Sequence, residues 1–188
     1  MGRWFEELCR IKHHKLRELV VSAETSLRSK LLPQDGGVYV FWWTGDLKKL
    51  YDCNREIILA GPGGRNVKLH FNDEWFGFSA ELPIPLYVGK NADSISKRVG
   101  SHLRLAQNRM LPLGGSSKKV KPPTTSCQLR AGIEHLFPDE QDSRTLILDN
   151  IGLSFVKING DIHAANRFYL EDLAIGKMRP VFNVDIER

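Results

Sequence analysis

The sequence predicts a mixed α+β fold with a small central antiparallel-type sheet flanked by helices, and three observations support this prediction. Apolar residues recur at steps of three, four or five over residues 3–32, which indicates an amphipathic helix. Three short runs of β-branched and aromatic residues, at 37–43 (GVYVFWW), 86–89 and 153–158 (LSFVKI), are typical of strands. Helical patterns follow the second and third runs, at residues 94–107 and 164–177.

The first predicted element is the N-terminal amphipathic helix, to which we assign residues 1–33. Pro33 and the turn sequence Gln-Asp-Gly-Gly end it, and its charged face is expected to leave His13 and His14 exposed. We expect the apolar stripe to serve partly as an interface with a second chain, although packing within one chain is the commoner fate of such a helix. The stripe consists of Trp4, Leu8, Ile11, Leu16, Leu19, Ala23, Leu27 and Leu31.

A first insert is expected near residues 44–84, between the first two strands of the core. Within it, residues 56–60 and 66–71 flank a Gly-Pro-Gly-Gly cluster, which predicts a hairpin with a loose tip. No Lys-Ser or Lys-Thr pair follows the glycines, so this cluster is not a phosphate-binding P-loop. The strand at 86–89 then leads into a helix that Asp93 or Ser94 can cap.

A second insert is expected near residues 108–148. It combines a loop rich in Gly, Ser, Pro and Lys at 109–125, a helix at 126–137 and a polar loop at 138–144. The strand at 153–158 and the last helix, which Pro180 stops, complete the core. Residues 34–188 therefore form one predicted domain, with the core order strand, strand, helix, inserted helix, strand, helix.

Composition and charge exclude several classes of protein. The chain has 188 residues, of which 41% are hydrophobic and 26% charged, and no apolar run approaches the roughly 20 residues of a membrane span. The three cysteines form no CxxC pair, which argues against a disulfide framework or zinc finger and favours reduced thiols in the cytoplasm. The N-terminus lacks a signal-peptide pattern. A net charge of +5 permits a polyanionic partner without requiring one.

Five short elements occur in an order that resembles the GIY-YIG nuclease superfamily. They are the triplet Gly37-Val38-Tyr39, the triplet Tyr87-Val88-Gly89, the helical pair Arg98 and His102, the helical Glu171, and Asn183 after Pro180. The triplets lie further apart than is usual in the family, and His102 stands where many members have tyrosine. That substitution, and the sequence around residues 43–52, make the chain most similar to the type II restriction endonucleases of the superfamily.

This resemblance implies a metal-dependent DNA endonuclease that hydrolyses phosphodiester bonds in double-stranded DNA. Tyr39 corresponds to the family's proposed general base, although a phenol with a pKa near 10 is a weak base unless nearby cations such as Lys90 and Arg98 lower that pKa. His102 is the alternative base, because the ordinary pKa of imidazole already suits the task. Arg98 lies four residues before His102 on one helix face and can fork onto two phosphate oxygens.

The resemblance also implies the remaining roles. Glu171 would bind Mg²⁺ or Mn²⁺, since such ions keep several waters and need only one or two protein carboxylates. Tyr87 would line the site, and Asn183 would support the backbone near it. We further expect DNA contacts from the basic second insert and its helix, through Lys118, Lys119, Lys121 and Arg130. A double-strand break at a symmetric site would ask for a homodimer on DNA.

Other interpretations compete with this one. Homing, phage, mobile-element and repair nucleases share the same superfamily, and a non-catalytic DNA-binding module could share the same fold. The presence of Tyr39, Arg98 and Glu171 together argues against the non-catalytic module. Taken singly, each residue has a plainer role, because tyrosine packs well in strands and Arg or Glu is common on helix surfaces.

Overall fold

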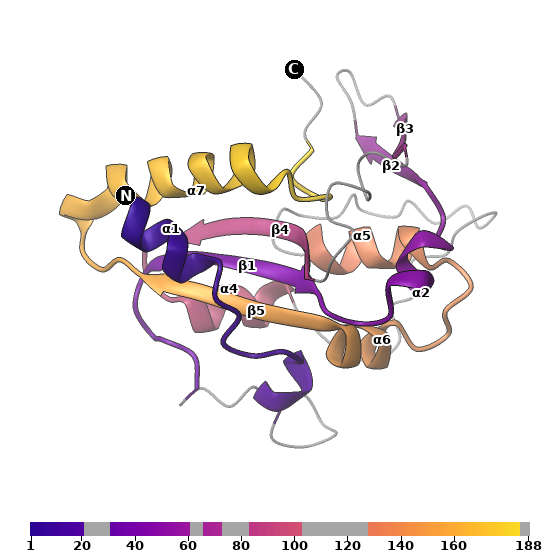
Figure 1. The fold of residues 1–188 in the computed structure, drawn as a ribbon, viewed down its shortest axis with the longest axis horizontal. Coiled ribbons are helices and arrows are strands. Elements are labelled where there is room, and N and C mark those ends of the chain that lie inside the picture. The colour runs from indigo at the N-terminus through magenta and orange to yellow at the C-terminus, as the bar shows by residue number, and fades with distance from the viewer. Residues whose placement is uncertain (21–30, 61–65, 73–82, 103–127, 185–188) are drawn as a thin grey trace.

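Three antiparallel strands in the order β4-β1-β5 form the central sheet of the computed structural model (Figure 1). The structure describes residues 1–20, 31–60, 66–72, 83–102 and 128–184. Its elements are α1 (Gly2–Leu8), η1 (Leu16–Leu19), β1 (Gly37–Trp43), α2 (Leu47–Tyr51), β2 (Glu56–Ala60), β3 (Asn66–His70), β4 (Ile84–Asn91), α4 (Ile95–His102), α5 (Gln128–Leu136), α6 (Ser143–Asn150), β5 (Ile151–Lys157), η4 (Asp161–His163) and α7 (Ala164–Met178). The predicted α+β class with a small antiparallel sheet is confirmed.

The central position of β1 explains its unbroken apolar sequence. All seven of its residues are buried, because strands pair with it on both sides and helices cover both sheet faces. Val38, Val40 and Trp42 point to the face that α1 and α7 cover. The alternate residues Tyr39, Phe41 and Trp43 point to the face covered by η1, α4, α5 and α6. Figure 1 shows α7 and α4 on opposite sides of the strands.

The predicted single N-terminal helix is wrong. Helix α1 ends at Leu8, and the chain then forms an antiparallel bridge between His13 and Leu153 of β5. The backbone amide of His13 donates to the carbonyl of Leu153 at 3.1 Å, and that of Leu153 donates back at 2.7 Å. A short 3-10 helix, η1, follows, and residues 21–30 lie outside the described part of the chain. His13 is half-buried rather than exposed, whereas His14 is exposed as expected.

The apolar stripe is divided between the two faces of the sheet, and this division explains the break. Leu8 and Ile11 pack on the face with α7, whereas Leu16 and Leu19 pack in the core on the opposite face. Since β5 is an edge strand, the segment from Ile11 to Leu16 passes around that edge and pairs with it. The N-terminal residues are therefore an integral part of the core rather than a separate helix.

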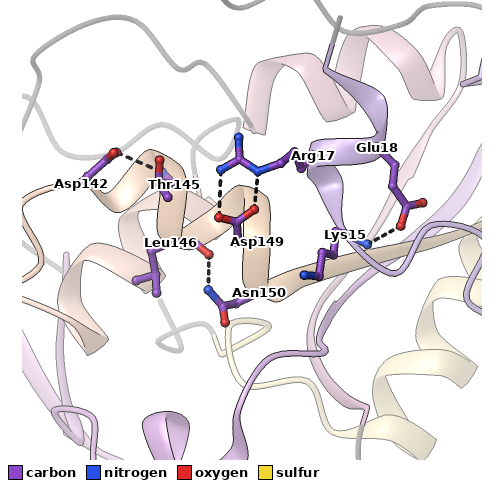
Figure 2. A network of polar contacts seen from close by, with 8 residues as sticks. All are labelled: Lys15, Arg17, Glu18, Asp142, Thr145, Leu146, Asp149 and Asn150. Atoms are coloured by element: carbon purple, nitrogen blue, oxygen red, sulfur yellow. Dashed lines mark hydrogen bonds and ion pairs between the residues drawn. The ribbon is translucent and has the colours of Figure 1, made fainter. Parts of the chain in front are cut away.

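Polar contacts hold this N-terminal segment in place. Figure 2 shows the guanidinium of Arg17 in η1 donating two hydrogen bonds to the carboxylate of Asp149 in α6. This contact raises the pKa of Arg17 and lowers that of Asp149. On the other sheet face, the buried hydroxyl of Ser154 donates to the carbonyl of Leu8 and accepts from the indole of Trp42. Together these contacts join both parts of the segment to the sheet and its helices.

The predicted hairpin within the first insert is confirmed. Strands β2 and β3 pair antiparallel from Glu56 opposite His70 to Ala60 opposite Asn66. The short helices α2 and α6 were not predicted, because both are too brief to show a clear helical period. No helix among the described residues is long and apolar enough to cross a membrane.

Candidate active site

Tyr39 and Tyr87 lie side by side on the sheet face that α4 covers. Tyr39 of β1 stands opposite Gly89 of β4 in the strand register, and the ring centres of Tyr39 and Tyr87 are 6.4 Å apart. A Cβ atom at Gly89 would lie 2.5 Å from the phenol oxygen of Tyr39 and 2.9 Å from the ring of Tyr87. The glycine that ends the second triplet is therefore what allows the Tyr39 ring to lie across β4.

Helix α4 brings His102 onto these two rings. The hydroxyl of Ser94 accepts a hydrogen bond from the amide of Lys97 and caps the start of the helix, as one of the two predicted caps. At the other end, a hydrogen bond of 2.8 Å joins Nε2 of His102 to the phenol oxygen of Tyr39. His102 is fully buried, and its Nδ1 has no hydrogen-bond partner among the residues that the structure describes.

Arg98 lies one helical turn before His102, and its charge affects the ionisation of both tyrosines as well as of His102. Its positive charge opposes the ionisation of His102 and favours the ionised form of Tyr39 and of Tyr87. Both tyrosines also have hydrogen-bond interactions with Arg98. Because the side chain remains partly accessible, it retains room to meet a phosphate as well as the phenols.

Burial dominates the acid–base properties of this cluster. It raises the pKa of Tyr39 above that of an ordinary phenol, and the opposing effect of Arg98 is smaller. The pKa of Tyr39 is therefore raised rather than lowered, although Arg98 acts in the direction expected of a nearby cation. Burial also lowers the pKa of His102 to about 3, with Arg98 adding to the effect. At neutral pH the hydrogen-bonded pair therefore consists of a neutral phenol and a neutral imidazole.

Glu171 and Lys90 form an ion pair at the edge of the sheet. Glu171 projects from α7, Lys90 belongs to the edge strand β4, and their side chains are 14% and 39% exposed. The negative charge of Glu171 reaches the phenols, since it contributes to raising the pKa of both Tyr39 and Tyr87. The ion pair thus belongs to the same electrostatic cluster, although α7 and α4 cover opposite faces of the sheet.

Asn183 holds the strand that carries Tyr87. Its side-chain oxygen accepts from the amide of Val88 at 2.7 Å, and its side-chain nitrogen donates to the Val88 carbonyl at 2.8 Å. The preceding amide of Phe182 donates to the carbonyl of Leu86 at 2.8 Å, so this segment pairs along the outer edge of β4. Asn183 therefore fixes the backbone of Val88, which lies between Tyr87 and Gly89.

Comparison with known proteins does not assign this chain to a family or a function. No family model, curated protein or solved structure matches this chain. The interpretation of the cluster therefore depends on its geometry and on the order of its residues in the sequence.

This cluster offers a carboxylate, that of Glu171, as a ligand for a divalent metal ion. Within the described ranges, no group of three or more His, Cys, Asp or Glu side chains is arranged to hold a metal ion. Glu171 is an acidic residue whose charge reaches Tyr39 and Tyr87, and its carboxylate is engaged by Lys90. Such a donor set fits Mg²⁺ or Mn²⁺, which take most of their ligands from water and substrate oxygens, and does not fit a closed zinc site.

Of the four residues predicted to contact DNA, three fall outside the part of the chain that the structure describes, and one is engaged in an ion pair. Lys118, Lys119 and Lys121 fall outside the described residues. In α5, the Nε of Arg130 donates to Glu134 at 2.7 Å, and the Arg130 side chain is only 17% exposed. A phosphate contact by Arg130 would therefore require it to leave this ion pair.

Phe168 lies beside the cluster but is not among the residues predicted from the sequence. The ammonium of Lys90 lies 5.2 Å from the ring centre of Phe168, which precedes Glu171 by three residues on α7. The signal was present in the sequence as two adjacent aromatic residues, Phe168 and Tyr169, just before the helical glutamate. Their exposure could not be deduced, because a periodic pattern does not identify which face of an isolated helix meets the sheet.

Proposed function

We propose that this chain is a metal-dependent DNA endonuclease with a GIY-YIG type of active site. The observation that carries the proposal is the hydrogen bond between Tyr39 and His102 beside the guanidinium of Arg98. This arrangement combines a proton acceptor with a cation suited to phosphate, which are the groups that hydrolysis of a phosphodiester requires. Glu171 supplies a carboxylate within electrostatic range of the same atoms.

Tyr39 and His102 act as one unit in the proposed reaction. As an attacking water forms its bond to phosphorus, its proton passes to the phenol oxygen of Tyr39, and the phenol proton passes to Nε2 of His102. Burial disfavours both the phenolate and the imidazolium. The two transfers therefore occur in concert, so that no phenolate is formed and the imidazolium of His102 is short-lived. His102 returns its proton through Tyr39 to solvent, and the departing 3′ oxygen takes a proton from solvent. Tyr39 and His102 therefore serve together as the general base, and neither residue is the base alone.

Arg98 and Lys90 neutralise charge on the phosphate. The planar guanidinium of Arg98 can donate to two phosphate oxygens at once, which the single ammonium of a lysine cannot do. Lys90 lies on the same strand as Tyr87 and reaches the edge of the cluster where Glu171 stands. Two cations at one phosphate favour the extra negative charge that develops during attack.

A divalent ion, when bound, would be held by Glu171 and by oxygens of water and DNA, and it would stabilise negative charge on the departing 3′ oxygen. The protein's own contribution is to offer this carboxylate and to balance it with Lys90 until the ion arrives.

We further propose that the enzyme is of the type II restriction class and cuts double-stranded DNA. Digestion of supercoiled plasmid and phage DNA with Mg²⁺, followed by sequencing of the ends, tests this directly. The proposal requires cleavage that stops in excess EDTA, with ends at a common sequence. Cleavage at scattered or structured positions would favour a repair or mobile-element nuclease, and binding without cleavage would favour a non-catalytic DNA-binding module.

A further inference from the structure

Phe168 and Tyr169 form an exposed aromatic pair beside the candidate active site. They are 48% and 60% exposed, and their rings meet edge to face with centres 5.5 Å apart. Helix α7 instead packs against the sheet through Leu170 and Ala174. Isolated exposed apolar residues are common on proteins, whereas two exposed aromatic rings in contact with each other beside charged residues are a candidate surface for a ligand.

Lys90 makes this surface continuous with the active site. Its ammonium pairs with Glu171 and lies 5.2 Å from the ring centre of Phe168, a distance at which a cation is attracted to an aromatic face. A phosphate that reaches Lys90 would therefore place its own nucleotide next to Phe168. The ring faces that remain exposed are available for stacking.

The negative charge of Asp172 beside the rings favours contact with a nucleobase over contact with the negatively charged sugar–phosphate backbone. Asp172 is exposed on α7 and lies four residues after Phe168 and three after Tyr169, so it shares their side of the helix. Its carboxylate repels a phosphate, but it can accept hydrogen bonds from the amino group of a base. A base stacks on aromatic rings whatever its sequence, because every base has a π face.

A second copy of the chain fits this surface less well. A stable protein interface buries at least about 1,200 Å² in total. Each aromatic side chain can bury at most about 250 Å², so this pair supplies only a small part of that area.

We infer that Phe168 and Tyr169 are a stacking subsite for an unpaired nucleobase, adjacent to the phosphate held by Arg98 and Lys90. This inference rests on the proposed function and extends it, because it states that one base of the bound DNA strand is unpaired and unstacked. The nucleotide beside the cut is drawn out of its stack, so single-stranded or locally opened DNA binds more tightly through this surface than an intact duplex does.

Binding measurements in EDTA test the inference without cleavage. The probes are a 12-nucleotide single strand carrying 2-aminopurine and the matching duplex, both at low salt. The double variant Phe168→Leu and Tyr169→Leu is expected to lose about tenfold or more in affinity for the single strand, and much less for the duplex. In the wild-type protein, 2-aminopurine fluorescence should be quenched on binding, and the double variant should lose this quenching.

Two controls separate stacking from other effects. Phe168→Tyr keeps an aromatic ring and should keep the affinity, while Ile58→Ala removes an exposed apolar side chain on β2 and should change nothing. An equal loss for both probes, or no loss, would overturn the inference. A lower mass of the free double variant in light scattering would assign the surface to a second copy instead.

The same experiment distinguishes this inference from the proposed function. If the wild-type protein binds neither probe, the nuclease proposal fails together with the subsite. If the wild-type protein binds and cuts DNA while the double variant binds both probes normally, only the stacking subsite is wrong.

Discussion

The hydrogen bond between Tyr39 and His102 joins two groups that are poor catalysts when considered separately. Burial keeps the phenol protonated and the imidazole neutral, so the charged form that general-base chemistry leaves on either group alone is disfavoured and short-lived. Their contact at 2.8 Å allows a proton to pass through the pair without resting on Tyr39. This coupling leads to two predictions at the scale of single residues.

Replacement of Tyr39 by Phe should lower the rate of cleavage much more than the affinity for DNA. The variant removes only the phenol oxygen and keeps the ring in the core, and loss of general-base help costs about 10²- to 10⁴-fold in rate. Single-turnover cleavage and DNA binding measured in parallel check this. Tyr51→Phe, which lies outside the cluster, serves as the control. Near-normal turnover of Tyr39→Phe would remove the phenol from the mechanism.

Acid should destabilise the protein through His102. Because the folded pKa is about 3 and the ordinary value is 6.5, the unfolded chain binds an extra proton between these values. The free energy of unfolding should therefore fall as the pH drops below 6.5, by at most about 1.4 kcal/mol per pH unit from this group.

Urea unfolding of wild-type protein and His102→Gln at pH values from 7.5 to about 4 measures this contribution. The Gln variant should show a shallower fall than the wild type over this range. The exposed His14 provides the matched control, since His14→Gln should keep the wild-type slope. Parallel curves for wild type and His102→Gln would mean that His102 titrates normally in the folded protein.

At the scale of elements, the site depends on how closely β1 and β4 approach. Gly89→Ala would place a methyl group 2.5 Å from the phenol oxygen of Tyr39, so Tyr39 must move. We expect a loss of about 1–3 kcal/mol of stability from overpacking, with a large loss of cleavage. Gly176→Ala in α7 meets nothing within 4 Å and should be neutral or stabilise by about 0.5–1 kcal/mol. Equal thermal stability of the two variants would contradict this view of the strand contact.

The elements also show what could be predicted from the sequence. The first strand was predicted at its observed limits, because a run of β-branched and aromatic residues with a glycine start and a turn after it is a local signal. The N-terminal helix was predicted wrongly, because counting apolar residues does not reveal which surface each will meet. The step of five between Ile11 and Leu16 was the available sign that the helical period is broken there.

The residues of the candidate site were selected by their order in the chain, but their contacts depend on tertiary structure. The pairing of Lys90 with Glu171 joins β4 to α7, which no local pattern could indicate. The burial of His102, which sets its pKa, likewise depends on the tyrosines that reach it from two strands.

At the scale of the whole molecule, the buried N-terminal segment changes the expectation about assembly. Leu8, Leu16 and Leu19 are fully buried within their own chain, so this part of the predicted stripe cannot form an interface. We therefore expect a monomer in free solution and two copies on DNA when both strands are cut. Light scattering with and without a cognate duplex measures both masses. One copy on DNA that produces only nicked circles would contradict the homodimer.

The central claim is that Glu171 serves metal-dependent cleavage by the cluster of Tyr39, His102 and Arg98. The most direct measurement is parallel binding and single-turnover cleavage of one DNA substrate by wild-type protein and Glu171→Gln, with Mg²⁺ and with excess EDTA. We predict that the variant folds and binds but does not cut, that wild type cuts only with Mg²⁺, and that Glu6→Gln on α1 behaves as wild type. Cleavage by Glu171→Gln at the wild-type rate, or by wild type in excess EDTA, would contradict the claim.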